Sequence, residues 1–98
     1  MLTENEKKFY DEEGYLLVND VISSSQLNKI HYITNKLIEK SKIINKSDHI
    51  YDLEKGHNKN NPRLTRIKQP HKVNQFFWDI IKESNIQQIL VDLLGGDV

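Results

Sequence analysis

Residues that could take part in chemistry gather between Asp48 and His71. This stretch holds three of the four histidines of the chain and is the least periodic part of the sequence. From position 55 to position 72 it carries basic residues and no acidic one. The basic residues are Lys55, Lys59, Arg63, Arg66, Lys68 and Lys72. A long polar loop that ends in a basic, strand-like run is a common place for ligand contacts, so we predict a ligand-binding surface here.

Arg66 and Lys68 are the first candidates for a binding role within this stretch. On an extended strand, residues i and i+2 project to the same face, so both side chains should meet the same ligand. A guanidinium can bind a carboxylate through two parallel hydrogen bonds, which ranks Arg66 before Lys68. The alternative interpretation is a solvated edge strand, whose charges prevent pairing with another sheet. The sequence leaves both interpretations open.

The other polar residues of the stretch form no defined catalytic or metal-binding pattern. His49 and His57 have a spacing that matches no familiar set of metal ligands, and the chain has no cysteine to supply a thiolate. Asp48 and Asp52 could pair as acid and base, but such residues also commonly flank turns and strands. We therefore predict no catalytic residue and no metal ligand among them.

Composition and charge exclude several classes of partner. The formal net charge is zero, with 14 basic and 14 acidic residues, so the chain as a whole has no attraction for nucleic acid. The basic run also lacks interleaved aromatic residues. No apolar run approaches the roughly 20 residues of a membrane span, and the N-terminus lacks the apolar segment of a secretory signal. We expect a soluble, cytoplasmic protein that binds neither nucleic acid nor membranes.

Short amphipathic helices and strands must position the polar stretch. Capping boxes, which pair Ser or Thr with Glu or Gln three residues later, predict helix starts at Thr3, Ser23 and Ser84. A further N-cap is expected at Asn74. The expected helix ends are Glu13, Ser41, Lys82 or Glu83, and Leu94. The expected strands are Tyr15–Val18, Ile50–Leu53 and Arg63–Lys68. Asn61 and Gln69 should be extended because a proline follows each.

The two C-terminal helices have broad apolar faces that few strand residues could cover. Apolar residues make up 37% of the chain, against about 45–50% in typical domains. Trp78, with Phe76 and Phe77, should lie in the core, and the long helix after Ser23 should pack on a sheet. An apolar face that stays exposed cannot offset the entropy of ordering it. We therefore expect residues 1–98 to be an α+β, mainly helical segment of a larger fold whose sheet lies outside this chain.

Several short runs also occur in a recognisable order along the chain. They are Phe9–Val18 (FYDEEGYLLV), Val21–Ser23 (VIS), Asp48–His57 (DHIYDLEKGH), Asn61–Arg63 (NPR), Arg66–His71 (RIKQPH), Phe77–Asp79 (FWD) and Leu90–Val98 (LVDLLGGDV). In this order they resemble the N-terminal region of the phytanoyl-CoA dioxygenase family of iron(II)/2-oxoglutarate oxygenases. The resemblance covers nearly all of this chain but only about the first third of a family member.

The resemblance implies a catalytic double-stranded β-helix, or jelly-roll, downstream of this segment. Such a domain holds iron(II) with a His-X-Asp motif and a distant histidine, three ligands on one face. The residues two positions after the four histidines here are Ile33, Tyr51, Lys59 and Val73, so the motif is absent. The parent protein would hydroxylate a small organic substrate, whereas this chain alone should bind no iron or 2-oxoglutarate and be inactive.

The resemblance also implies a role for the basic strand. Arg66 or Lys68 would approach 2-oxoglutarate or line the wall of the substrate site, and a phosphorylated or CoA-type substrate would suit the same basic rim. A second hypothesis is a non-enzymatic small α+β binding module that is complete by itself, with the C-terminal helices as a potential dimer interface.

Overall fold

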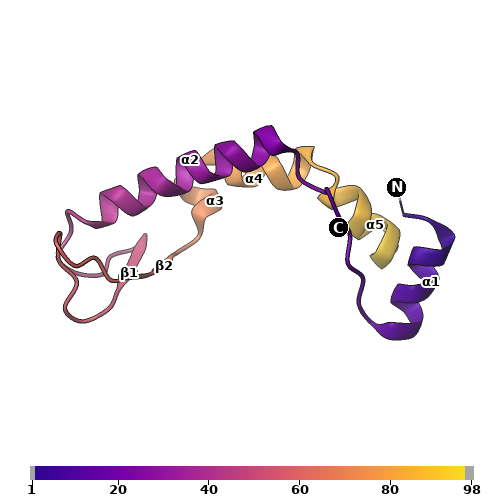
Figure 1. The fold of residues 1–98 in the computed structure, drawn as a ribbon, viewed down its shortest axis with the longest axis horizontal. Helices are drawn as coiled ribbons and strands as arrows, with labels where there is room; N and C mark the ends of the chain where they lie inside the picture. Colours follow the sequence, from indigo (N-terminus) through magenta and orange to yellow (C-terminus); the bar gives the residue numbers. More distant parts are fainter. Residues whose placement is uncertain (1, 97–98) are drawn as a thin grey trace.

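The computed structural model describes residues 2–96, which form an elongated body of helices with one small hairpin (Figure 1). Along the chain the elements are α1 (Glu4–Glu13), α2 (Ser24–Ser41), β1 (Tyr51–Leu53), β2 (Leu64–Ile67), α3 (Pro70–Val73), α4 (Gln75–Glu83) and α5 (Ile86–Leu94). The hairpin lies at one end, α2 and α4 run along the middle, and α5 and α1 lie at the other end. This mixture of helices and a two-stranded antiparallel sheet agrees with the predicted α+β class.

The first two helices begin at the predicted capping boxes. The Thr3 hydroxyl accepts a hydrogen bond from the Glu6 N–H at 3.1 Å, and the Glu6 carboxylate accepts one from the Thr3 N–H at 2.9 Å. Ser23 and Gln26 exchange the same two bonds at the start of α2. Gly14 ends α1 in the left-handed conformation, with φ 80°, as predicted for a residue without Cβ.

The third predicted capping box is wrong. Helix α5 begins at Ile86, one residue later than the box requires, so Asn85 takes the N-cap position without a side-chain bond. The Ser84 hydroxyl instead accepts from the Ile86 N–H at 3.2 Å. Gln87 then lies one position too early in the helix to reach back to the cap. The end of α5 at Gly95 agrees with the prediction, while Asp97–Val98 lie outside the described residues.

The strand predicted at Tyr15–Val18 is also wrong. Within residues 2–96 this run pairs with no strand and serves as an extended connection between α1 and α2. Leu17 is 80% exposed, and the Tyr15 ring contacts the edge of Phe9 with ring centroids 5.3 Å apart. A strand forms only where another strand accepts and donates its backbone hydrogen bonds, and no such neighbour is present here.

The hairpin confirms the other two predicted strands. Strands β1 and β2 are antiparallel, with Tyr51 opposite Ile67 and Asp52 opposite Arg66. The register then shifts, so that Leu53 lies opposite Leu64 and Thr65 is the extra residue of a bulge. The Thr65 hydroxyl donates to the Asp52 carbonyl at 2.8 Å, which satisfies a backbone group beside the irregularity.

The junction after β2 differs from the expectation for a residue that precedes proline. Gln69 is left-handed, with φ 47° and ψ 57°, instead of extended. Proline disfavours the right-handed helical conformation of the preceding residue, and Gln69 avoids it by adopting the left-handed one. Pro70 then opens the short helix α3, which the sequence did not predict. Asn74 caps α4 as predicted, accepting from the Phe76 N–H at 2.9 Å.

The core is small and lies where α2 meets the hairpin and α4. Within the described part of the chain, the buried apolar side chains are Ile33, Leu37, Tyr51 and Ile80. The Tyr51 hydroxyl donates to the Leu37 carbonyl at 2.6 Å, which joins β1 to α2. Helix α2 lies along α4, where the Lys29 ammonium sits 4.7 Å from the centre of the Phe76 ring. This helix was predicted to pack on a sheet, and within the described residues the only sheet that it contacts is the two-stranded hairpin.

Much apolar surface is left uncovered. Trp78, predicted to lie in the core, is instead 42% exposed, with the His71 ring and the Lys82 ammonium beside its indole. The Cα radius of gyration is 17.8 Å, whereas a compact domain of about 100 residues has a radius near 13 Å. Helix α1 meets α5 at the far end, where the Leu2 N–H donates to the Asp92 carboxylate at 3.3 Å.

Candidate functional site

The hairpin brings Arg66 and Lys68 together on one face, around the carboxylate of Asp52. Arg66 Nε and Nη2 lie 2.7 and 2.5 Å from Asp52 Oδ2, and Lys68 Nζ lies 3.1 Å from Asp52 Oδ1. The predicted common face of the two basic residues is therefore confirmed. The role of Asp52 was not predicted, because it depends on the register that places Asp52 directly opposite Arg66.

This ion cluster changes what the two basic residues can do. Hydrogen bonds from Arg66 and then Lys68 hold the pKa of Asp52 below its ordinary value, so the carboxylate stays ionised. The Arg66 side chain is 69% exposed, which makes the pair a surface ion pair that contributes little to stability. Asp52 occupies the position that the carboxylate of a ligand would take on Arg66. A ligand would have to displace it or bind on the outer side of the guanidinium.

Asp48 organises the turn before β1. One oxygen of its carboxylate accepts from the backbone N–H groups of Ile50 and Tyr51, at 2.8 and 2.7 Å. The N–H of Tyr51 and then that of Ile50 are the largest causes that lower the pKa of Asp48. Lys68 Nζ also donates to the Asp48 carbonyl. The pKa of Asp48 and that of Asp52 are both lowered, so neither carboxyl is tuned toward the raised pKa of a general acid.

His57 joins the loop between the strands to helix α2. Its Nδ1 accepts from the Arg63 N–H at 2.8 Å, so the ring is neutral and its Nε2 donates to the Ser41 carbonyl, also at 2.8 Å. Both ring nitrogens are therefore engaged in structure. Among residues 2–96, no group of three or more His, Asp or Glu side chains is placed to hold a metal ion.

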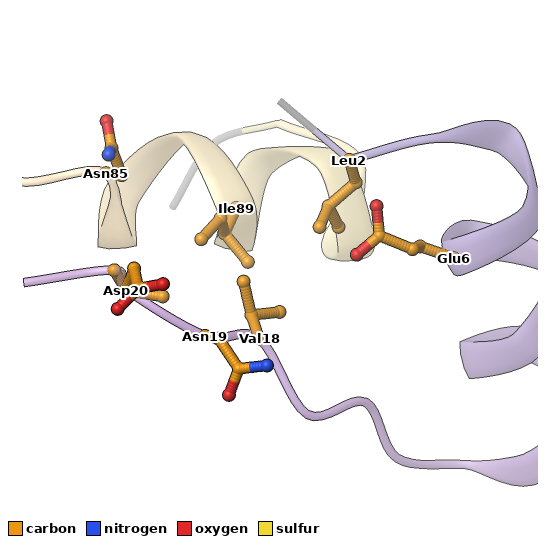
Figure 2. Close-up of a pocket in the computed structure, with 8 residues that line it drawn as sticks. Leu2, Glu6, Val18, Asn19, Asp20, Asn85 and Ile89 are labelled. Atoms are coloured by element: carbon orange, nitrogen blue, oxygen red, sulfur yellow. The ribbon is translucent and has the colours of Figure 1, made fainter.

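Several hollows lie on the described surface, among them one beside the contact of α1 with α5 and one beside the ion cluster. The smaller, about 130 Å³, lies where α1, residues 18–21 and α5 meet, with Leu2, Val18 and Ile89 pointing toward one another (Figure 2). Its Glu6 carboxylate already caps α1, and Asn19, Asp20 and Asn85 line it beside the apolar side chains. The larger, about 310 Å³, lies beside the ion cluster and is lined by His49, Ile50, Lys68, Gln69, Lys72 and Val73. The sequence pointed to the basic residues there but gave no signal for the turn at Gln69 that brings them together.

Comparison of the chain with protein-family models, curated proteins and solved structures found no match. No helix in the described part of the chain combines the length and the apolar character needed to cross a membrane.

Proposed function

We propose that the chain is the N-terminal, mainly helical segment of a cytoplasmic iron(II)/2-oxoglutarate oxygenase of the phytanoyl-CoA dioxygenase type. In this proposal the helices form a frame that packs on a catalytic jelly-roll, and the parent protein hydroxylates a small organic substrate. Iron binding belongs to the jelly-roll, because the histidines of this chain lack the His-X-Asp pattern and His57 is committed to two structural hydrogen bonds. The order of motifs along the sequence supports the choice of family.

The apolar surface of the helical frame carries the proposal that it packs on another body. Among the described residues, the large apolar side chains that are at least 40% exposed are Phe9, Tyr15, Leu17, Leu27, Tyr32, Ile43, Trp78, Ile81 and Leu94. They outnumber the four buried apolar residues given above. An ordered helix with this much uncovered apolar surface gains its stability from a partner surface, and a sheet of a jelly-roll is such a surface.

The hairpin would contribute to the wall of the active site. With iron, 2-oxoglutarate supplies the oxidising chemistry of this class of enzyme, and this chain would only orient a carboxylate. Arg66 could do so from its outer side while Asp52 holds the inner one, and Lys68 would fix Asp52 through its ion pair. The alternative, a purely structural ion cluster, fits the direct opposition of Asp52 and Arg66 in the sheet.

The experiment that tests the proposal starts with the native reading frame beyond codon 98. This reading frame should encode a His-X-Asp or His-X-Glu motif and a later histidine. The protein that it encodes should convert 2-oxoglutarate to succinate only with iron(II). Arg66→Gln should raise the KM for 2-oxoglutarate about tenfold if the guanidinium binds its carboxylate, with Lys59→Gln as the charge-matched control. A stop codon after Val98, together with cooperative unfolding of the chain, would overturn the proposal and favour a small binding module.

A further inference from the structure

The hollow beside the ion cluster is lined by basic, polar and apolar side chains. It lies between the turn that precedes β1 and the junction of β2 with α3, and its volume is about 310 Å³. Two lysines and a histidine line it, together with the apolar side chains of Ile50 and Val73, and no acidic side chain does. We propose that this hollow binds the phosphate group of a small phosphomonoester.

The backbone holds the walls of this hollow in place. The Lys68 N–H donates to the Ile50 carbonyl at 2.6 Å, which closes the side formed by the strand and the turn. Gln69 then reverses the chain in a left-handed conformation, and the Lys72 N–H donates to the Gln69 carbonyl at 2.9 Å. Such a conformation is uncommon for a residue with a Cβ and is retained where its surroundings require it. Its effect here is to bring Lys72 to the same hollow as Lys68.

The charges near the hollow leave it cationic. Asp48 and Asp52 are the acidic residues that Lys68 contacts, and both carboxylates are occupied by donors of the hairpin itself. Lys68 Nζ uses two of its three donors on the Asp48 carbonyl and the Asp52 carboxylate, which leaves one N–H for a ligand. Within residues 2–96, no hydrogen bond or ion pair engages Lys72 Nζ or the His49 ring, so an anion could bind them without displacing a partner.

The arrangement of these groups suits a phosphate better than a carboxylate. Lysine ammonium groups act as point charges toward phosphate oxygens, whereas planar carboxylates match the fork of an arginine, and no arginine lines the hollow. Donors from three different walls can reach the several oxygens that a phosphate presents. Ile50 and Val73 would contact the organic part of a monoester, which inorganic phosphate lacks.

The test is a titration of the ¹⁵N-labelled chain with inorganic phosphate and with phenyl phosphate, at an ionic strength held constant with chloride. We expect saturable shifts of the Ile50, Gln69 and Lys72 amide signals and tighter binding of phenyl phosphate. Lys72→Gln should weaken the binding of phenyl phosphate about tenfold, and His49→Gln should weaken it in the same direction. Lys59→Gln removes the same charge from an exposed loop position outside the hollow and should leave binding unchanged.

Three outcomes would overturn the inference. Shifts that do not saturate would mean that the hollow is no site, and an equal loss in Lys59→Gln would mean a diffuse charge effect. Tighter binding of benzoate than of phenyl phosphate would assign the hollow to carboxylates. The assay contains neither iron nor 2-oxoglutarate, so its result is independent of the oxygenase proposal.

Discussion

Asp48 fixes the start of the hairpin with a single carboxylate oxygen that accepts two backbone hydrogen bonds. These bonds favour the ionised form and hold the pKa of the carboxyl below its ordinary value of 3.8. The unfolded chain therefore binds a proton at a pH where the folded chain does not. The stabilisation from Asp48 is complete above the unfolded-state pKa and is lost as the pH falls through the lower, folded-state pKa.

We expect the Asp48 carboxyl carbon, followed by ¹³C NMR, to titrate below pH 3.8 in the folded chain and near that value in concentrated urea. The Ile50 and Tyr51 amides should lose protection from hydrogen exchange over the same low pH range. Asp48→Asn keeps an acceptor oxygen but cannot titrate, so its amides should stay protected as the pH falls. Equal midpoints for Asp48 in buffer and in urea would contradict the assignment.

At the scale of single residues, the sequence predicted which side chains share a face but not what they meet. The spacing of Arg66 and Lys68 was enough to place them together, since strand geometry has a period of two. Their partner Asp52 depends on a register that a bulge at Thr65 helps to set, and such pairing comes from the whole hairpin. Lys72 joins the same surface only because Gln69 adopts a left-handed conformation.

At the scale of elements, His57 connects three parts of the structure. It lies in the loop between the strands, accepts from the backbone just before β2 and donates to the end of α2. The carbonyl that it reaches belongs to Ser41, the one fully buried side chain among residues 2–96. Removal of the ring would break both bonds, so the loop would lose its links to β2 and to α2.

His57→Ala should therefore destabilise the chain by about 1–3 kcal/mol, the sum expected for two hydrogen bonds whose partners remain. The measurement is the midpoint of urea unfolding, together with the exchange rate of the Arg63 amide, which should rise. His31→Ala, at an exposed position on α2, is the matched control and should leave both quantities nearly unchanged. Similar effects of the two substitutions would show that His57 does not connect these elements.

Local rules predicted the helices better than the strands. The boxes at Thr3 and Ser23 and the glycines at the helix ends act within a few residues, so their effect could be inferred from spacing. The box at Ser84 failed because Ser84 directly follows the end of α4 and α5 starts only at Ile86, one residue later than the box requires. Tyr15–Val18 has the composition of a strand, but a strand also needs a neighbour that composition cannot provide.

At the scale of the whole molecule, the chain is long and thin, with extents of 51 × 27 × 23 Å. We expect small-angle X-ray scattering to give a radius of gyration near the 17.8 Å of the Cα atoms, well above the roughly 13 Å of a compact domain. A radius near 13 Å would contradict this arrangement.

The uncovered apolar side chains should also bind the dye ANS. Leu17→Gln should reduce that binding without lowering stability, because Leu17 is 80% exposed.

The apolar content of the sequence predicted the small core but not the elongated shape of the molecule. A value of 37% apolar residues limits how much can be buried, whatever the arrangement. The elongated form depends on which elements touch, and here each helix of the α3–α4–α5–α1 series contacts mainly the next one. Such contacts depend on the turns between elements, of which the one at Gln69, between β2 and α3, could not be predicted from the residues around it.

The contact between α1 and α5 sets an order of events during synthesis. Leu2 and Asp92, which a hydrogen bond joins, are 90 positions apart in the chain. At roughly 5–20 residues per second, a ribosome needs about 5–18 s to make the chain between them. During that interval α1 has only local interactions such as its capping box to hold it, and a helix of 10 residues is marginal by itself. Helix α1 therefore leaves the ribosome well before α5, its tertiary partner.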